Sequence, residues 1–145
     1  MRISNFQYPA FEPYKKATLE VYMQGCLRDT CTGPCHNPAL RDMCGGEEWT
    51  IDEVFNWIEE RKDLFDCISF TGGDPLFQES ELKKLVEKLI FKCLWLFTGE
   101  DDWDKIPQWC KEKFDYIKYG GYKKELRQEG FPASSNQKLV KITRE

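Results

Sequence analysis

Residues Cys67-Ile-Ser-Phe-Thr71 form a short apolar run that stops at Gly72-Gly73-Asp74-Pro75. A run of this length, bounded by glycine and proline, is typical of a buried β-strand followed by a turn. Ala17–Met23 alternates apolar and polar residues, as a strand does, and Cys93–Thr98 is another apolar run that ends at Gly99. Each of these three predicted strands therefore ends at a loop that contains glycine or cysteine.

Helices are predicted between these strands. Thr50-Ile-Asp-Glu53 is a capping box and opens a helix over residues 51–62, and Ser80 is expected to cap a second helix. The apolar stripe of that second helix is Leu82, Leu85, Val86, Leu89 and Ile90. A helix over about 103–113, a strand over about 115–119 and a last strand over 138–143 complete the pattern, which predicts an α/β fold with a largely parallel sheet in one domain, residues 1–145.

The loops after the strands are expected to meet. In parallel α/β sheets, ligands bind beyond the carboxyl ends of the strands. The loop Gly25–Gly46 follows the first strand, and the three later strands end at Gly72-Gly73-Asp74, at Thr98-Gly99 and at Gly120-Gly121. The sequence thus predicts one rim where four loops surround a ligand.

Seven cysteines in a chain without a recognisable export signal argue against a disulfide framework and favour thiolates that bind a metal or a cluster. Cys26, Cys31, Cys35 and Cys44 crowd into the loop after the first strand. The others stand singly in apolar surroundings and are expected to be small buried hydrophobes: Cys67, Cys93 and Cys110.

The spacing Cys26-x4-Cys31-x3-Cys35 admits two kinds of site. Three thiolates can hold a 4Fe-4S cluster with one iron left open, or they can bind structural zinc with Cys44 or His36 as a fourth ligand. The cysteines alone leave both open. The Gly72-Gly73-Asp74 segment and the parallel-sheet pattern favour the cluster, with Cys44 as a spare thiol.

Charge and hydropathy exclude other classes. A net charge of −4 and a pI near 5.2 argue against a duplex nucleic-acid binder. No stretch has the length and apolarity of a secretory signal or a membrane span, so we expect a soluble cytoplasmic protein with a protein or small-molecule partner. The five tryptophans are assigned to the core, and the acidic run Glu100-Asp101-Asp102 to a solvated loop.

These motifs resemble the radical S-adenosylmethionine superfamily and, more closely, the anaerobic ribonucleotide reductase activating proteins. The residues that carry the resemblance are Gly25-Cys26, Cys31, Cys35-His36-Asn37-Pro38, Thr71–Leu76, Trp95–Gly99, Phe114–Gly120 with Tyr122, and Asn136–Leu139. They follow the family's order over roughly residues 17–142. Two departures are one extra residue in each cysteine interval, and Tyr119 where the family often has aspartate.

The resemblance implies a site. Cys26, Cys31 and Cys35 would bind a 4Fe-4S cluster whose open iron chelates S-adenosylmethionine. Gly72, Gly73 and Asp74 would receive the methionine amino group, and Thr98 is a further candidate contact. Pro34 and His36 would lie against the adenine or its ribose.

The resemblance also implies a fold and an activity. The fold would be a short, open, partial (βα) barrel of radical S-adenosylmethionine type. With an external one-electron donor, the enzyme would cleave S-adenosylmethionine reductively to a 5′-deoxyadenosyl radical, which removes hydrogen from a glycine of anaerobic ribonucleotide reductase. Two alternatives remain open: a radical enzyme with another glycyl-radical protein or a small molecule as substrate, and a zinc-stabilised binding module.

Overall fold

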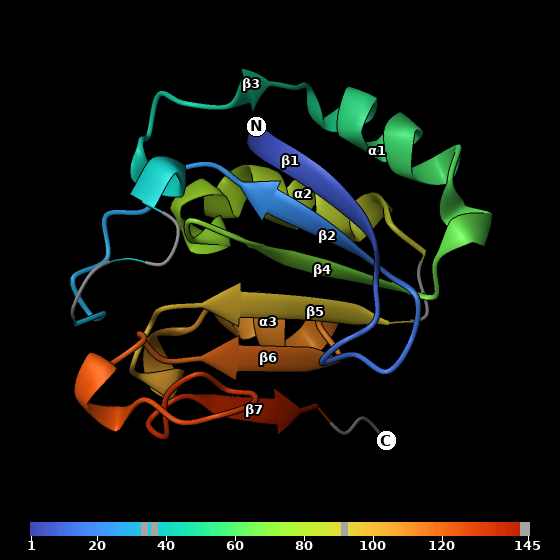
Figure 1. The fold of residues 1–145 in the computed structure, drawn as a ribbon. Coiled ribbons are helices and arrows are strands. Elements are labelled where there is room, and N and C mark those ends of the chain that lie inside the picture. The colour runs from blue at the N-terminus through green and yellow to red at the C-terminus, as the bar shows by residue number, and fades with distance from the viewer. Residues whose placement is uncertain (33–34, 36–37, 91–92, 143–145) are drawn as a thin grey trace.

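The computed structural model describes residues 1–32, 35, 38–90 and 93–142, which contain one seven-stranded sheet (Figure 1). The strands are β1 (Arg2–Ala10), β2 (Thr18–Met23), β3 (Glu47–Glu48), β4 (Cys67–Gly72), β5 (Leu94–Thr98), β6 (Tyr116–Tyr119) and β7 (Lys138–Lys141). Their order across the sheet is β3-β1-β2-β4-β5-β6-β7. The four central strands β2, β4, β5 and β6 run parallel, and the outer strands add antiparallel. The α/β class with a parallel centre is confirmed, and the sheet is open.

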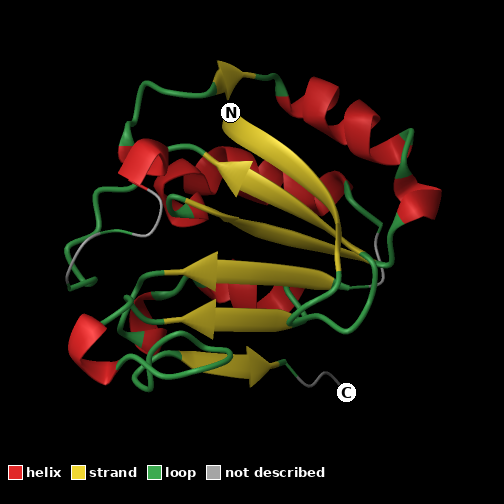
Figure 2. Ribbon diagram, in the orientation of Figure 1, coloured by secondary structure: helices red, strands yellow, loops and turns green. Residues whose placement is uncertain are grey.

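Three α-helices connect the central strands in the described part of the chain: α1 (Ile51–Glu59), α2 (Glu79–Lys88) and α3 (Gln108–Lys113). In Figure 2, α2 and α3 lie behind the sheet and α1 lies along its upper edge. All three contribute to the main core cluster, where α1 supplies Val54 and α2 supplies Leu85. The side chains of β5 alternate between the two faces of the sheet. Leu94 and Leu96 join the main core cluster with the helices, while Trp95 points to the other face.

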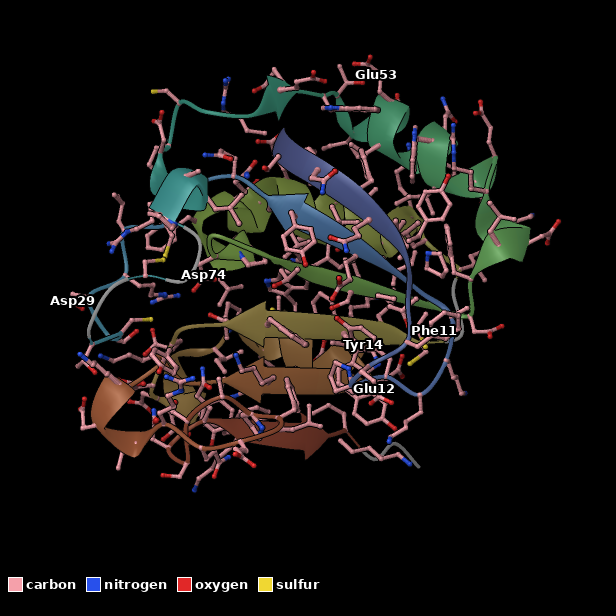
Figure 3. The ribbon with its side chains drawn as sticks, viewed as in Figure 1. Phe11, Glu12, Tyr14, Asp29, Glu53 and Asp74 are labelled. Carbon is pink, nitrogen blue, oxygen red and sulfur yellow. The ribbon has the colours of Figure 1, made fainter. Side chains whose placement is uncertain are left out.

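A smaller cluster covers the face of the sheet opposite the helices. Tyr14, Cys67 and Trp95 are its buried members, and the rings of Tyr14 and Trp95 meet edge to face with centroids 4.8 Å apart. The Tyr14 hydroxyl donates a hydrogen bond to Glu20 at 2.6 Å. Tyr14 therefore lies in front of the sheet and covers part of it (Figure 3).

Several predicted boundaries are wrong. Ser80 does not cap the second helix, because Pro75–Gln78 forms a 3₁₀ turn, capped by Asp74, that leads directly into α2 at Glu79. Ile90 does not belong to the apolar stripe: α2 ends at Lys88, and Ile90 is exposed.

The helix expected over 103–113 is divided into two elements. Trp103–Lys105 is a 3₁₀ turn, and α3 begins only after Pro107. The sequence pattern does not predict β1. Only Ile3 of that strand is fully buried, so β1 shows little of the alternation that predicts a strand.

Among the described residues, no helix is long and apolar enough to cross a membrane.

Candidate functional site

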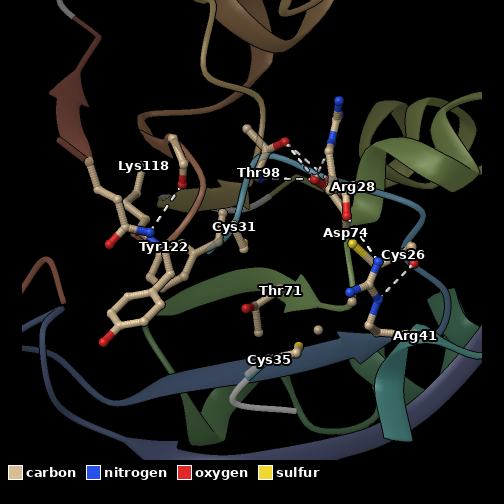
Figure 4. A pocket seen from close by; sticks show the side chains of 16 residues that line it. Cys26, Arg28, Cys31, Cys35, Arg41, Thr71, Asp74, Thr98, Lys118 and Tyr122 are labelled. Atoms are coloured by element: carbon tan, nitrogen blue, oxygen red, sulfur yellow. Dashed lines mark hydrogen bonds and ion pairs between the residues drawn. The ribbon is translucent and has the colours of Figure 1, made fainter. Parts of the chain in front are cut away.

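Three cysteines line one cavity of about 270 Å³ at the carboxyl end of the parallel strands (Figure 4). Cys26 and Cys35 are half-buried, and Cys31 is exposed. Cys44, an alternative ligand, is exposed and is not among the residues that line the cavity. The predicted ligand set Cys26, Cys31 and Cys35 is thus brought to one place from a single loop.

The spacing of these thiols bears on what they can bind. In the described part of the chain, no three histidine, cysteine or acidic side chains lie close enough together to hold a single metal ion. A four-iron cluster is wider than one ion, so its thiolate ligands stand farther apart around it. Three thiols around a shared cavity are compatible with a 4Fe-4S cluster, and His36, a candidate fourth ligand of a zinc site, lies outside the described residues.

Two glycines let the end of β4 pack against the start of the cysteine loop. The backbone N–H groups of Gly73 and Asp74 donate to the carbonyls of Met23 and Gly25, at 3.0 and 2.9 Å. A Cβ at Gly72, whose φ is +126°, would stand 2.2 Å from the Met23 carbonyl oxygen, and one at Gly73 would stand 2.4 Å from that of Gly25. Side chains are therefore excluded beside Cys26.

Arg41 and Arg28 hold the loop around Cys26. Arg41 donates to the carbonyls of Cys26 and Arg28, at 3.4 and 2.9 Å. The Cys26 thiol has a raised pKa because it is partly buried, and Asp74 raises it further, while a backbone hydrogen bond from Arg28 opposes the shift. A metal bound to the sulfur would replace the thiol proton and would stabilise the thiolate in spite of its burial.

Thr30 anchors the same loop on the other side of the cavity, next to Cys31. Its hydroxyl donates to the Gly99 carbonyl at 2.5 Å, and its own carbonyl accepts from Lys123 Nζ at 2.5 Å. Gly121 packs so closely that a Cβ there would stand 2.5 Å from Thr30. The loop segment that contains Cys31 is therefore attached to the ends of two later strands.

Asp74 is the centre of a buried polar network. It is 1% exposed, and its carboxylate accepts from the Thr98 hydroxyl, from the Gly99 N–H at 2.9 Å and from Arg28 Nε at 2.8 Å. Arg28 also pairs with Glu100 at 2.9 Å. Burial alone would lower the pKa of Arg28, but Asp74 and Glu100 raise it. The prediction of a solvated loop is wrong for Glu100, which is 15% exposed in this ion pair.

The predicted site residues of the later loops reach this cavity. Gly72, Gly73, Asp74 and Thr98 all line it together with the three cysteines. Asp74 and Thr98 line the cavity, and the hydrogen bonds between them also join the ends of their two strands. Pro34 and His36 lie outside the described residues.

Lys118 is a lining residue that the sequence analysis missed. It stands on β6, its ammonium lies 5.2 Å from the centre of the Phe97 ring, and no acidic side chain of the described residues pairs with it. Burial lowers its pKa, while the nearby Cys31 and Asp74 act in the opposite direction. The sequence offered one signal for this residue. Lys118 stands two residues before Gly120-Gly121, at the end of the fourth predicted strand, and faces the same side of that strand as Tyr116.

Known proteins similar to this chain define its family. Residues 17–140 match the family described as the 4Fe-4S single cluster domain, and the chain belongs to that family. The predicted relationship to radical S-adenosylmethionine activating proteins is confirmed, and with it a 4Fe-4S cluster and S-adenosylmethionine as the cofactors of these proteins.

Three relatives illustrate the relationship. The chain is 28% identical over 96 residues to the anaerobic ribonucleoside-triphosphate reductase-activating protein of Escherichia coli K12, covering 60% of each chain. It is 32% identical over 95 residues to 7-carboxy-7-deazaguanine synthase of Methanocaldococcus jannaschii, covering 57% of this chain and 39% of that one. It is 40% identical over 63 residues to the pyruvate formate-lyase-activating enzyme of Clostridium pasteurianum, covering 40% of this chain and 25% of that one. The matches thus span at most 60% of the relatives' lengths.

Proposed function

We propose that this chain is a glycyl-radical activase that acts on an anaerobic ribonucleotide reductase. The observation that carries the proposal is the meeting of Cys26, Cys31 and Cys35 at one cavity with Gly72-Gly73-Asp74, at the carboxyl end of a parallel sheet. The Escherichia coli relative, whose name states activation of that reductase, supports the choice of partner.

The chain's residues divide the work around the cavity. Cys26, Cys31 and Cys35 would hold the 4Fe-4S cluster, which, reduced by an external donor, would supply the electron for reductive cleavage of S-adenosylmethionine and so for removal of a glycine hydrogen. Gly72, Gly73 and Asp74 bind the methionine end of the cofactor, and Thr98 supports Asp74. By resemblance, Pro34 and His36, both outside the described residues, would contact the adenosine. Lys118 offers a positive charge for a carboxylate.

The open sheet suits a polypeptide substrate. Helices α2 and α3 lie behind the sheet and α1 lies along its upper edge, while the opposite face of the described residues carries loops and the small cluster around Tyr14. We propose that residues 1–145 form a single radical S-adenosylmethionine domain, a short partial (βα) barrel whose openness admits a glycine-bearing segment. A cytoplasmic location follows from the same proposal, because a reducing compartment keeps the cluster ligands as thiolates.

Iron content tests the cluster before activity is measured. Anaerobically purified protein should be brown and carry on the order of four irons per chain. Cys26→Ala, Cys31→Ala and Cys35→Ala should each lose nearly all iron, whereas Cys44→Ala, the matched control, should keep it. Zinc without iron in the wild-type chain would overturn the proposal in favour of a zinc-stabilised binding module.

The partner is tested by electron paramagnetic resonance. Reduced, cluster-loaded protein mixed with S-adenosylmethionine and anaerobic ribonucleotide reductase should give a glycyl radical signal on the reductase. A chain that cleaves S-adenosylmethionine without producing that signal would instead be a radical enzyme with another glycyl-radical protein or a small molecule as substrate. The relationship to 7-carboxy-7-deazaguanine synthase, whose name denotes a small-molecule product, makes the second of these the main alternative.

A further inference from the structure

Cys67 and Cys93 lie side by side at the amino end of the sheet. Ile68 of β4 is in register with Leu94 of β5, and the Ile68 N–H donates to the Cys93 carbonyl at 3.0 Å. One residue earlier, Cys67 is the first residue of β4 and Cys93 immediately precedes β5, so the two cysteines stand opposite each other on neighbouring segments. Adjacent strands are about 4.8 Å apart, and residues paired across two adjacent strands point their side chains to the same face of the sheet. Disulfides need Cα atoms roughly 4.4–6.8 Å apart, so this placement permits a bond between the two thiols.

The surroundings distinguish the two sulfur atoms. Cys67 is 1% exposed in the small cluster with Trp95, whereas Cys93 is partly exposed. The indole N–H of Trp95 donates to Cys93 Sγ at 3.2 Å. Cys93 is thus the accessible member of the pair, and Cys67 is the sheltered one.

Hydrogen bonding favours a thiolate at Cys93. The Cys67 thiol and the Trp95 N–H stabilise the Cys93 anion and lower the pKa of Cys93, against the effect of burial. The contact between the two cysteines, together with burial, raises the pKa of Cys67. Lys16 lowers both pKa values, and Asp115 raises that of Cys93. An accessible thiolate beside a resolving thiol is the arrangement of reactive cysteine pairs.

The pair is separate from the cysteines of the cavity. Cys67 begins β4 and Gly72 ends it, so the two ends of that strand are about 16 Å apart at 3.3 Å per residue. The third cysteine outside the cysteine loop, Cys110, is fully buried in the main core, and burial raises its pKa to about 12. The Cys67–Cys93 pair therefore lies away from the cavity, and it differs from Cys110 because one of its thiols, that of Cys93, is partly exposed.

We propose that Cys93 and Cys67 form a second reactive site, a dithiol that exchanges with low-molecular-weight disulfides. The Cys93 thiolate attacks one sulfur of the small disulfide, forms a mixed disulfide and releases one small thiolate. Cys67 then attacks the Cys93 sulfur, forms the Cys67–Cys93 bond and releases the second. Two protein thiols are oxidised, one small disulfide is reduced to two thiols, and the two protein protons pass to those thiols. This chemistry needs neither the cluster nor the proposed activity.

Glutathione disulfide is a suitable probe, added anaerobically to cluster-loaded protein. Trypsin separates the relevant cysteines onto different peptides: Asp63–Lys83 carries Cys67, and Cys93–Lys105 carries Cys93. Mass spectrometry of a non-reduced digest should show these two peptides linked. Cys67→Ser should leave Cys93 as a glutathione mixed disulfide, and Cys93→Ser should give neither product. Cys110→Ser is the control and should behave as the wild type.

A measurement without substitutions protects the test against variants that fold poorly. In the native wild-type chain, iodoacetamide should label Cys93 at least about tenfold faster than Cys110 at pH 7, because labelling follows the thiolate fraction and exposure. The pH midpoint of Cys93 labelling should lie below the roughly 8.5 of a free thiol. Equal labelling of Cys93 and Cys110, or the absence of the linked peptides, would overturn the dithiol site. Cluster absorbance, followed in parallel, reports separately on the proposed function.

Discussion

At the carboxyl end of the sheet the cysteines stand on a long loop, whereas at the amino end Cys67 begins a strand and Cys93 immediately precedes one. The loop cysteines are positioned by contacts from elsewhere in the chain, such as Thr30 to Gly99 and Arg28 to Asp74. The strand cysteines are positioned by the parallel ladder itself. Cluster binding should therefore depend on single polar anchors and close backbone contacts, while the dithiol should depend on the sheet as a whole.

The largest expected effect of breaking an anchor is at Asp74. Asp74→Ala removes the acceptor of Arg28, Thr98 and the Gly99 N–H in a buried site, and it should destabilise the fold by about 3–5 kcal/mol and lower iron content sharply. Chemical denaturation and iron analysis measure the two effects. Asp29→Ala, an exposed position in the same loop (Figure 3), is the matched control and should change neither. Full iron content in Asp74→Ala would show that the network does not position the loop.

A smaller effect is expected from adding one methyl group beside Cys26. Gly73→Ala places a Cβ 2.4 Å from the Gly25 carbonyl oxygen and 2.6 Å from that of Leu40, so backbone must move. We expect a loss of about 1–3 kcal/mol and weaker cluster retention. Gly99→Ala is the control: its nearest neighbour, the Thr30 hydroxyl, would be 3.4 Å away, and iron content should stay near that of the wild type. Equal iron loss in both variants would contradict a specific role for the Gly73 contact.

The difference between the two ends also explains what the sequence could predict. Strands and their glycine-bearing ends follow from local patterns, so the sequence predicts the parallel centre of the sheet and the common rim of Cys26, Gly72 and Thr98. The anchors join residues far apart in sequence: Arg28 and Asp74 are 46 positions apart, and Thr30 and Lys123 are 93 apart. No local pattern encodes such pairs.

Local patterns also misled where neighbouring segments changed the geometry. The start of α2 was misplaced because Asp74 caps a 3₁₀ turn that precedes the helix, and β1 was missed because it buries little. Cys67 was correctly predicted to be buried, but its partner was not foreseen. Adjacency of Cys67 and Cys93 depends on the register of two strands, which hydrophobic alternation alone does not fix.

The smallest expected effect comes from damage at the amino end. Tyr14→Phe removes the hydroxyl that donates to Glu20 at 2.6 Å but leaves the ring against Trp95, and Tyr22 still donates to Glu20. The cost should be about 1–2 kcal/mol, because a charge-assisted hydrogen bond is lost while packing is kept. Denaturation of Tyr14→Phe and wild-type protein measures it. Iron content should be unchanged, since the substitution touches no anchor of the cysteine loop. Loss of iron at this mild cost would mean that the two ends of the sheet are coupled, and that the cluster loop depends on the strands as well as on its own anchors.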